Sequence, residues 1–171
     1  WGGWHEWRRC PPGQKIRDLR NGTDYNHAAK GSSIGLLMIS IIIVQYNKVA
    51  LTKQAILSFC RFHGNEHEII LVDNGSTDPS VSELKQEFPE IQIILNQKNV
   101  GFGPANNLGA KMAKGELLLF LNNDTITLAP FIPSVEVQFR ENPKLGILGP
   151  KLLNEDRTFQ LSAGSLPTFL R

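Results

Sequence analysis

The sequence predicts an α/β domain with a mostly parallel sheet flanked by helices. From Met38 onward, short runs rich in β-branched residues alternate with stretches of helical spacing about 10–14 residues long. Strands that alternate with helices of this length are typical of a parallel sheet covered on both faces. Ligands of such sheets bind beyond the carboxyl ends of the strands. Polar residues at those ends are therefore the first candidates for a functional site.

Each expected element follows from its own pattern. The run from Ile39 to Val44 has the length and composition of a buried strand, and the stretch after it carries an apolar stripe at helical spacing. Asp78 and Pro79 are residue types that suit the cap and the first position of a helix. The expected strands are 39–44, 67–72, 91–95, 117–121 and 145–148, and the expected helices are 49–62, 78–88, 104–113 and 129–140.

Residues 1–37 differ in character from the rest. They have little apolar periodicity, contain Pro11-Pro12, and carry tryptophans at positions 1, 4 and 7. We expect an N-terminal extension that is poorly ordered or non-native, with Met38 as the natural start. A docking peptide for a partner or a membrane surface is the alternative. Residues 38–171 are expected to form the globular part.

Bulk properties exclude several classes of protein. The net charge of +2 over 171 residues is too small to argue for nucleic-acid binding. The longest apolar run, 34–44, is too short for a bilayer, which needs roughly 20 residues. Cys10 and Cys60 have no paired spacing, which favours a reducing compartment over a disulfide framework.

Polar clusters follow all four of the first expected strands. They are Gln45-Tyr46-Asn47, Asp73 to Asp78, Asn96 to Asn107, and Asn122-Asn123-Asp124. Each cluster alone could be a turn or a helix cap, because these residue types dominate turns. A structural protein has no need for such clusters at four strand ends. Together they predict a ligand site at one edge of the sheet.

Two other patterns resemble known binding motifs but do not match them. Gly101 and Gly103 do not open a dinucleotide fingerprint, because the next glycine is Gly109 and the spacing is therefore wrong. His63 and His67 are four residues apart, but a glycine and a strand start separate them. They are expected to be surface histidines and not zinc ligands.

The clusters suit a nucleotide-sugar. Tyr46 and Asp73 can pack against and hydrogen-bond a base. The amides and positive dipole end of the helix after Pro104 suit a diphosphate, which Gly101 lets approach closely. A divalent cation, Mg²⁺ or Mn²⁺, can offset the charge of a leaving diphosphate, and Asp124 at a strand end is the expected metal ligand.

Five segments carry a resemblance to a known family. They are 40–47 (SIIIVQYN), 72–78 (VDNGSTD), 99–109 (NVGFGPANNLG), 115–125 (GELLLFLNNDT) and 149–156 (GPKLLNED). In this order the chain resembles family 2 glycosyltransferases over about residues 38–168. The resemblance implies the GT-A fold, here C-terminally truncated, and an inverting transfer of a sugar from a nucleotide-sugar donor.

The resemblance also implies roles for individual positions. Tyr46 and Asp73 match the residues that contact the base. The remaining donor-binding positions that it implies are Asn74, Ser76, Gly101, Phe102, Ala105, Asn106 and Asn123. Asn122-Asn123-Asp124 takes the place of the family's Asp-x-Asp motif, so that Asp124 alone is left as the direct metal ligand.

The Asn-Asn-Asp variant looks most like the rhamnosyltransferase-like branch. That branch implies dTDP-rhamnose as donor, a polysaccharide or glycolipid acceptor, and a bacterial cell-surface product. It implies a cytoplasmic enzyme, with peripheral association at the inner face of the membrane as a further expectation. The catalytic base of the family lies later in its sequence, so we expect it beyond Arg171 and none in this chain.

Two alternatives remain open. A sugar nucleotidyltransferase shares a related sheet, but it would carry a glycine-rich basic loop after the first strand, and the segment from Gln45 to Val49 has no glycine. A non-catalytic nucleotide-binding module is compatible with a missing base. Residues 154–157 are expected to form a hairpin turn and not a catalytic segment.

Overall fold

The computed structural model describes residues 16–17, 24–25, 37–78 and 81–161. The chain divides into two compact units, Trp1–Pro130 and Phe131–Arg171. The predictions made for the three tryptophans, Cys10 and Pro79 fall outside the described residues. Two short strands, β1 (Ile16–Arg17) and β2 (Asp24–Tyr25), pair antiparallel within the segment expected to be poorly ordered.

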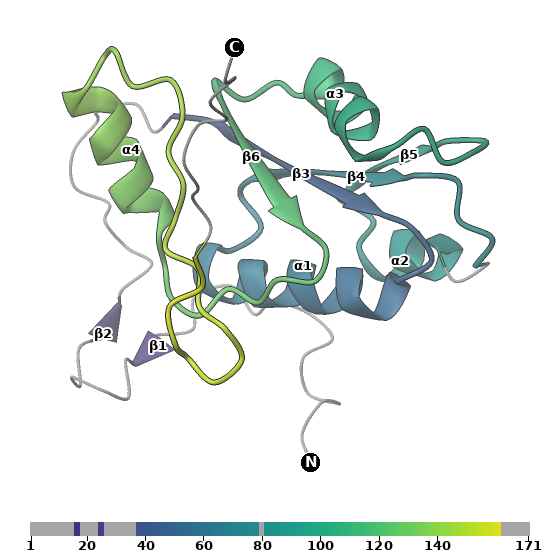
Figure 1. Ribbon diagram of the computed structural model, residues 1–171, viewed down its shortest axis with the longest axis horizontal. Coiled ribbons are helices and arrows are strands. Elements are labelled where there is room, and N and C mark those ends of the chain that lie inside the picture. Colours follow the sequence, from purple (N-terminus) through teal and green to yellow (C-terminus); the bar gives the residue numbers. More distant parts are fainter. Residues whose placement is uncertain (1–15, 18–23, 26–36, 79–80, 162–171) are drawn as a thin grey trace, which may run out of the picture. The chain divides into compact units, whose positions relative to one another are not determined.

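A four-stranded parallel sheet forms the centre of the first unit (Figure 1). The strands are β3 (Ile39–Gln45), β4 (Glu68–Asp73), β5 (Gln92–Leu95) and β6 (Leu117–Asn122), in the order β5-β4-β3-β6. Every pairing in this sheet is parallel. The predicted fold class is confirmed.

Helices cover both faces of this sheet. Figure 1 shows α1 (Val49–His63) and α2 (Val81–Glu87) on one face and α3 (Phe102–Met112) on the other. The central strand β3 is buried over its whole length. Its side chains alternate between two apolar layers, which explains why a continuous β-branched run stands here and not an apolar-polar alternation.

Helix α3 comes close to the sheet at a glycine. A methyl group on Gly109 would lie 2.6 Å from Ile42 Cγ2 and 3.2 Å from Val72 Cγ2. Ala105, one turn earlier in the helix, packs with Val44, Ile70 and Val72 in the same apolar layer. The small residues on this stripe therefore set the distance between α3 and the sheet.

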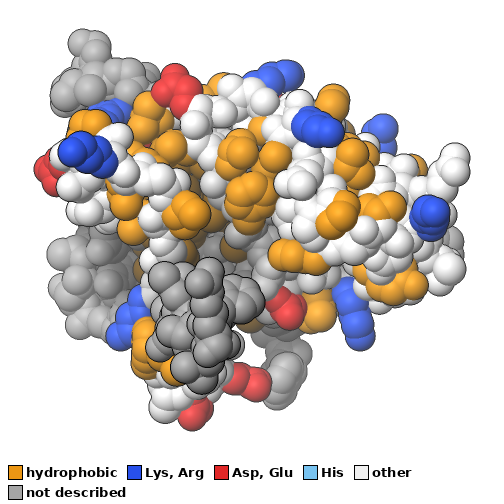
Figure 2. Space-filling view, turned by 45° about the horizontal axis from the view of Figure 1, so that its top comes forward, with side chains coloured by type: hydrophobic (Ala, Val, Ile, Leu, Met, Phe, Trp, Pro, Cys, Tyr) orange, Lys and Arg blue, Asp and Glu red, His pale blue; other side chains and the backbone are white. Residues whose placement is uncertain are grey.

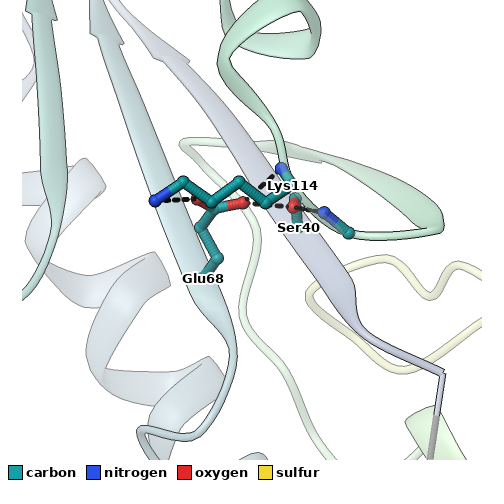
Figure 3. Close-up of polar contacts among 4 residues, drawn as sticks. Ser40, Glu68 and Lys114 are labelled. Atoms are coloured by element: carbon teal, nitrogen blue, oxygen red, sulfur yellow. Dashed lines mark hydrogen bonds and ion pairs between the residues drawn. The ribbon is translucent and has the colours of Figure 1, made fainter.

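A polar cluster ties the amino-terminal end of the sheet together (Figure 3). Ser40 Oγ donates to Glu68 Oε2 at 2.5 Å and accepts from the Gly115 N–H at 2.8 Å. The Lys114 N–H donates to the same Glu68 oxygen at 2.8 Å. These bonds join β3, β4 and the connection between α3 and β6, so they fix where β6 begins.

One side of β6 is open. Leu118 and Phe120 pair in register with Ser40 and Ile42 and therefore point to the α3 face of the sheet, where they are 42% and 51% exposed. Figure 2 shows apolar side chains at the surface on this side of the molecule. Since α3 contacts β3 and β4, it leaves this part of the face uncovered.

The second unit contains helix α4 (Ile132–Glu141) and a hairpin turn. Leu153 and Phe159 form an antiparallel bridge around the predicted turn at 154–157, which is thus confirmed. Inside the turn, Asp156 accepts hydrogen bonds from the Thr158 hydroxyl at 2.6 Å and its N–H at 2.9 Å. These bonds hold the pKa of Asp156 below its usual value.

Two expectations about local structure were wrong. Residues 145–148 form no strand, because Gly146 interrupts the short apolar run and no strand among the described residues pairs with it; Ile147 is 90% exposed. His63 is buried and not a surface residue, because it lies one turn after Phe59 on the inner stripe of α1, with ring centroids 4.8 Å apart. Within the described residues, no helix is long and apolar enough to cross a membrane.

The close approach at Gly109 predicts opposite effects for two glycines of the same helix. We expect Gly109→Ala to lower the free energy of unfolding by about 1–2 kcal/mol, because overpacking against Ile42 outweighs the gain in helix propensity. Gly103 has no atom within 4 Å of an added methyl group. Gly103→Ala should therefore leave stability unchanged or raise it by up to about 1 kcal/mol. Urea unfolding of both variants measures the difference, and equal effects would contradict the packing described here.

Candidate functional site

A pocket of about 480 Å³ opens at the carboxyl ends of β3, β4 and β6. The amino-terminal end of α3 adds to its wall. This is the place predicted for ligands of a parallel sheet. Its lining residues are Val44, Gln45, Tyr46, Lys48, Asn74, Asn99, Phe102, Asn122, Asn123 and Asp124.

A buried amide organises the first wall. Gln45 is 1% exposed, and its Nε2 donates to the Asp73 carboxylate and to Ser76 Oγ at 3.0 Å. Its Oε1 accepts the Lys48 N–H at 3.3 Å. The Asn47 N–H donates to Ser76 Oγ at 2.9 Å. These bonds tie the turn after β3 to the turn after β4 and present Tyr46 and Lys48 at the pocket.

Asp73 lies behind this wall. The residue is 5% exposed, and its carboxylate accepts hydrogen bonds from Gln45 and Ser76. It is not among the residues that line the pocket. The predicted contact with a base stays a prediction, while the observed contacts give Asp73 a place in the frame of the two turns.

A second buried amide, that of Asn74, organises another part of the wall. Asn74 Oδ1 accepts hydrogen bonds from Asn96 Nδ2 and the Val100 N–H, both at 3.1 Å. Its Nδ2 donates to Asn99 Oδ1 at 2.9 Å and to the Gly101 carbonyl at 3.3 Å. The Asn74 side chain thus attaches the loop between β5 and α3 to the end of β4 by four hydrogen bonds.

The start of α3 forms the next part of the wall. Gly101 has a φ of 91°, a conformation that favours glycine, and Phe102 after it is 60% exposed. Ala105 is buried in the core, and Asn106 Nδ2 donates to the Phe102 carbonyl at 3.0 Å. Of these predicted donor-binding residues, only Phe102 lines the pocket, and the other three shape the turn that carries it.

The Asn-Asn-Asp segment ends β6 with side chains on alternating sides. Asn123 Nδ2 donates to Thr52 Oγ1 of α1 at 3.2 Å. Asn122 and Asp124 are exposed at the pocket. Asp124 is the only carboxylate among the lining residues, and the part of the chain that the structure describes holds no cluster of three or more His, Cys, Asp or Glu that could bind a metal.

The oxygen-bearing side chains of the pocket are compatible with a hard cation that takes most of its ligands from a substrate. Mg²⁺ is commonly held by one or two carboxylates together with substrate phosphates and water. Asp124 provides the one carboxylate, and Asn122 adds an amide oxygen nearby. The residues fit such an ion and do not form a closed cage of protein ligands.

Half of the predicted site residues line the pocket. They are Tyr46, Asn74, Phe102, Asn123 and Asp124, whereas Asp73, Ser76, Gly101, Ala105 and Asn106 are not among the lining residues. No role had been assigned to the lining residues Lys48 and Asn99. Lys48 follows the first strand by three residues, so its place at a strand end could have identified it.

Solved structures share this fold. The crystal structure of S. aureus TarS 1–349 in complex with UDP aligns with a TM-score of 0.55 and 20% identity, covering 63% of this chain and 33% of that one. The structure of the same protein in complex with UDP-GlcNAc gives 0.53 and 21%, covering 62% and 32%. At this level of identity the likeness concerns the fold.

Sequence relatives are closer over shorter stretches. An uncharacterized glycosyltransferase of Haemophilus influenzae is 31% identical over 65% of this chain and 37% of its own length. The O-antigen biosynthesis protein RfbC of Myxococcus xanthus is 38% identical over 54% of this chain and 8% of its own length. The chain thus spans little more than a third of the first of these relatives.

The family assignment rests on a longer match. Residues 40–167 match the family described as Glycosyl transferase family 2. The matched range contains all four strands of the parallel sheet except Ile39 and every residue that lines the pocket. The chain belongs to glycosyl transferase family 2.

Proposed function

We propose that this chain is the donor-binding part of an inverting glycosyltransferase, which moves a sugar from a nucleotide-sugar to a polysaccharide or glycolipid acceptor. One observation carries the proposal. A single pocket joins exposed aromatic rings, a lysine, a helix amino-terminus and one carboxylate at the carboxyl edge of a parallel sheet. Each of these groups suits a different part of a nucleotide-sugar.

The aromatic side chains suit the base. Tyr46 is 46% exposed and Phe102 is 60% exposed, and both line the pocket. Every nucleobase has a flat face that stacks on an aromatic ring. The neighbouring amide of Asn99 can hydrogen-bond a base or a ribose.

The positive groups suit the diphosphate. Lys48 lines the pocket, and α3 begins at Phe102 in the same wall. The free amides and the dipole at a helix amino-terminus attract anions. An ammonium group adds a full positive charge, which lysines provide in many phosphate sites.

Asp124, with help from Asn122, would hold Mg²⁺ or Mn²⁺ against the diphosphate. Such an ion stabilises the negative charge that grows on the leaving group. During transfer the acceptor oxygen forms a bond to the anomeric carbon, and the bond to the diphosphate oxygen breaks with its electron pair. Lys48 and the α3 amides would stabilise the released diphosphate. The proton of the acceptor hydroxyl passes to a general base, and no residue that lines the pocket is assigned this role.

The donor is proposed to be a pyrimidine nucleoside diphosphate sugar, with dTDP-rhamnose as the candidate from the sequence resemblance. The UDP and UDP-GlcNAc complexes of the structurally similar TarS support a pyrimidine diphosphate. The likeness to an O-antigen biosynthesis protein supports a bacterial surface polysaccharide as product. A lipid-linked acceptor would place the protein at the inner face of the membrane.

A non-catalytic nucleotide-binding module is the second candidate. It is favoured by one observation: the only carboxylate among the lining residues is the one that suits the metal. Such a module would bind the nucleotide through the same pocket. Transfer of sugar to an acceptor by the protein that contains this chain separates the two candidates.

Removal of the Asp124 carboxylate tests the metal site. In calorimetric titrations of UDP and dTDP, we expect Mn²⁺ to raise the affinity of the unchanged chain by about tenfold or more. A tenfold rise corresponds to about 1.4 kcal/mol of binding free energy. Asp124→Asn should abolish this increase and leave the metal-free affinity unchanged. Glu116→Gln removes an exposed carboxylate just before the other end of β6 and serves as the control. A metal effect that persists in Asp124→Asn would disprove the assignment.

The role of Lys48 predicts a difference between a nucleoside and its diphosphate. We expect Lys48→Gln to weaken UDP binding about tenfold, since a hydrogen bond to a charged group contributes about 1.5–3 kcal/mol. Uridine binding should not change, because it lacks the phosphates. Lys53→Gln, further along α1, removes a lysine whose Nζ lies 2.7 Å from Glu87 Oε2 and should alter neither affinity. An equal loss for uridine and UDP would show that Lys48 does not act on the diphosphate.

A further inference from the structure

We propose that Asn74 is a positioning residue that shapes the donor pocket through the loop of residues 96–101 and makes no hydrogen bond to the donor itself. The proposal rests on the proposed function, because it concerns the same pocket. It differs from the role implied by the family resemblance, in which Asn74 is part of the surface that contacts the nucleotide.

The hydrogen-bonding capacity of Asn74 is already used. A primary amide has two N–H donors and an oxygen that accepts two bonds. Asn96 Nδ2 and the Val100 N–H occupy the oxygen, and Asn99 Oδ1 and the Gly101 carbonyl occupy the two donors. No position is left for a ligand.

The backbone partners fix the orientation of this amide. The Val100 N–H can only donate and the Gly101 carbonyl can only accept. A rotation of the amide by half a turn would place donor against donor and acceptor against acceptor. With 2% of Asn74 exposed, water cannot relieve such a mismatch. The loop is therefore held in one conformation.

Gly75, the next residue, lets the backbone of the same loop approach closely. Gly75 has a φ of 79°, and a methyl group on it would lie 2.4 Å from the Lys98 carbonyl carbon and 2.7 Å from the Asn99 nitrogen. The Asn96 N–H also donates to the Asp73 carbonyl at 2.9 Å. The loop thus rests on the backbone of the turn after β4, with the Asn74 side chain as its main attachment.

The hydrogen bonds of Asn74 affect the pocket through two residues, Asn99 and Phe102. Asn99, which accepts from Asn74, also accepts the Gly101 N–H at 2.9 Å, and Gly101 directly precedes α3. Asn99 and Phe102 both line the pocket. A loop that is fixed before the donor arrives loses less conformational freedom on binding, so it binds more tightly.

The first test measures the loop without any ligand. We expect Asn74→Ala to speed amide hydrogen exchange over residues 96–101 by about tenfold or more, because the bond to Val100 and the support of Asn99 are lost. Asn96→Ala removes one of the four bonds and should give a smaller increase. Ser40→Ala is the matched control. Ser40 is a buried residue near the start of β3, at the end of the sheet away from the loop, and its side chain makes two hydrogen bonds. This substitution should leave exchange in the loop unchanged.

The second test measures UDP and dTDP affinity of the same variants by calorimetry. We expect Asn74→Ala to weaken binding about tenfold, Asn96→Ala to weaken it less, and Ser40→Ala to leave it unchanged. An affinity loss in Asn74→Ala with normal exchange in the loop would mean direct contact with the donor and would overturn the proposal. Faster exchange with normal affinity, or equal losses in Ser40→Ala, would overturn it as well. If the unchanged chain bound neither nucleotide, the proposed function would fail, whereas the exchange experiment would still decide whether Asn74 holds the loop.

Discussion

The parallel register of β3 with its two neighbours is the constraint on which the site depends. β3 pairs Gln45 with Asp73 on one side and Val44 with Asn122 on the other. Because all strands run the same way, each strand ends at the same edge and delivers its polar turn there. A shift of one residue in either pairing would turn the side chains of a strand to the opposite face. The buried apolar layers on both sides of β3 exclude such a shift, so the apolar core specifies the geometry of a polar site.

Two neutral amides join the turns to one another, and one of them also donates to the buried carboxylate of Asp73. Gln45 links the turns after β3 and β4, and Asn74 links the turn after β4 to the loop before α3. Both side chains are almost completely buried, at 1% and 2% exposed. A buried charge carries a large desolvation cost unless it is hydrogen-bonded, as Asp73 is by Gln45 and Ser76, whereas a fully bonded amide carries little. The amides also have both donors and acceptors, so each can bind several backbone groups of unlike kind.

This arrangement explains what the sequence could and could not predict. The four strands of the parallel sheet and the three helices of the first unit follow from apolar periodicity, and the location of the pocket follows from the rule for parallel sheets. The residues that face the pocket could not be separated from those behind it, because both kinds are polar and adjacent in the same turns. Asp73 shows the difficulty: its side chain points to Gln45 and Ser76, and only the register of β3 with β4 determines this. The failed strand at 145–148 shows that a short apolar run needs a partner strand, which periodicity alone does not reveal.

The pocket lining contains few charged side chains, and this affects how it could bind a metal ion. Among the lining residues, Lys48 and Asp124 are the only charged side chains, and the remaining polar groups are neutral. One carboxylate attracts a divalent ion only weakly, because such ions normally need several oxygen ligands. In the proposed function the diphosphate provides the missing oxygens, so ion and donor bind more tightly together than apart. In the proposed function, replacement of the first carboxylate of the Asp-x-Asp motif by Asn122 would therefore shift the control of metal binding from the protein to the donor. Among the lining residues it would also leave Asp124 as the one acid that could compete for Lys48, so that the positive charge of Lys48 would remain available to the diphosphate.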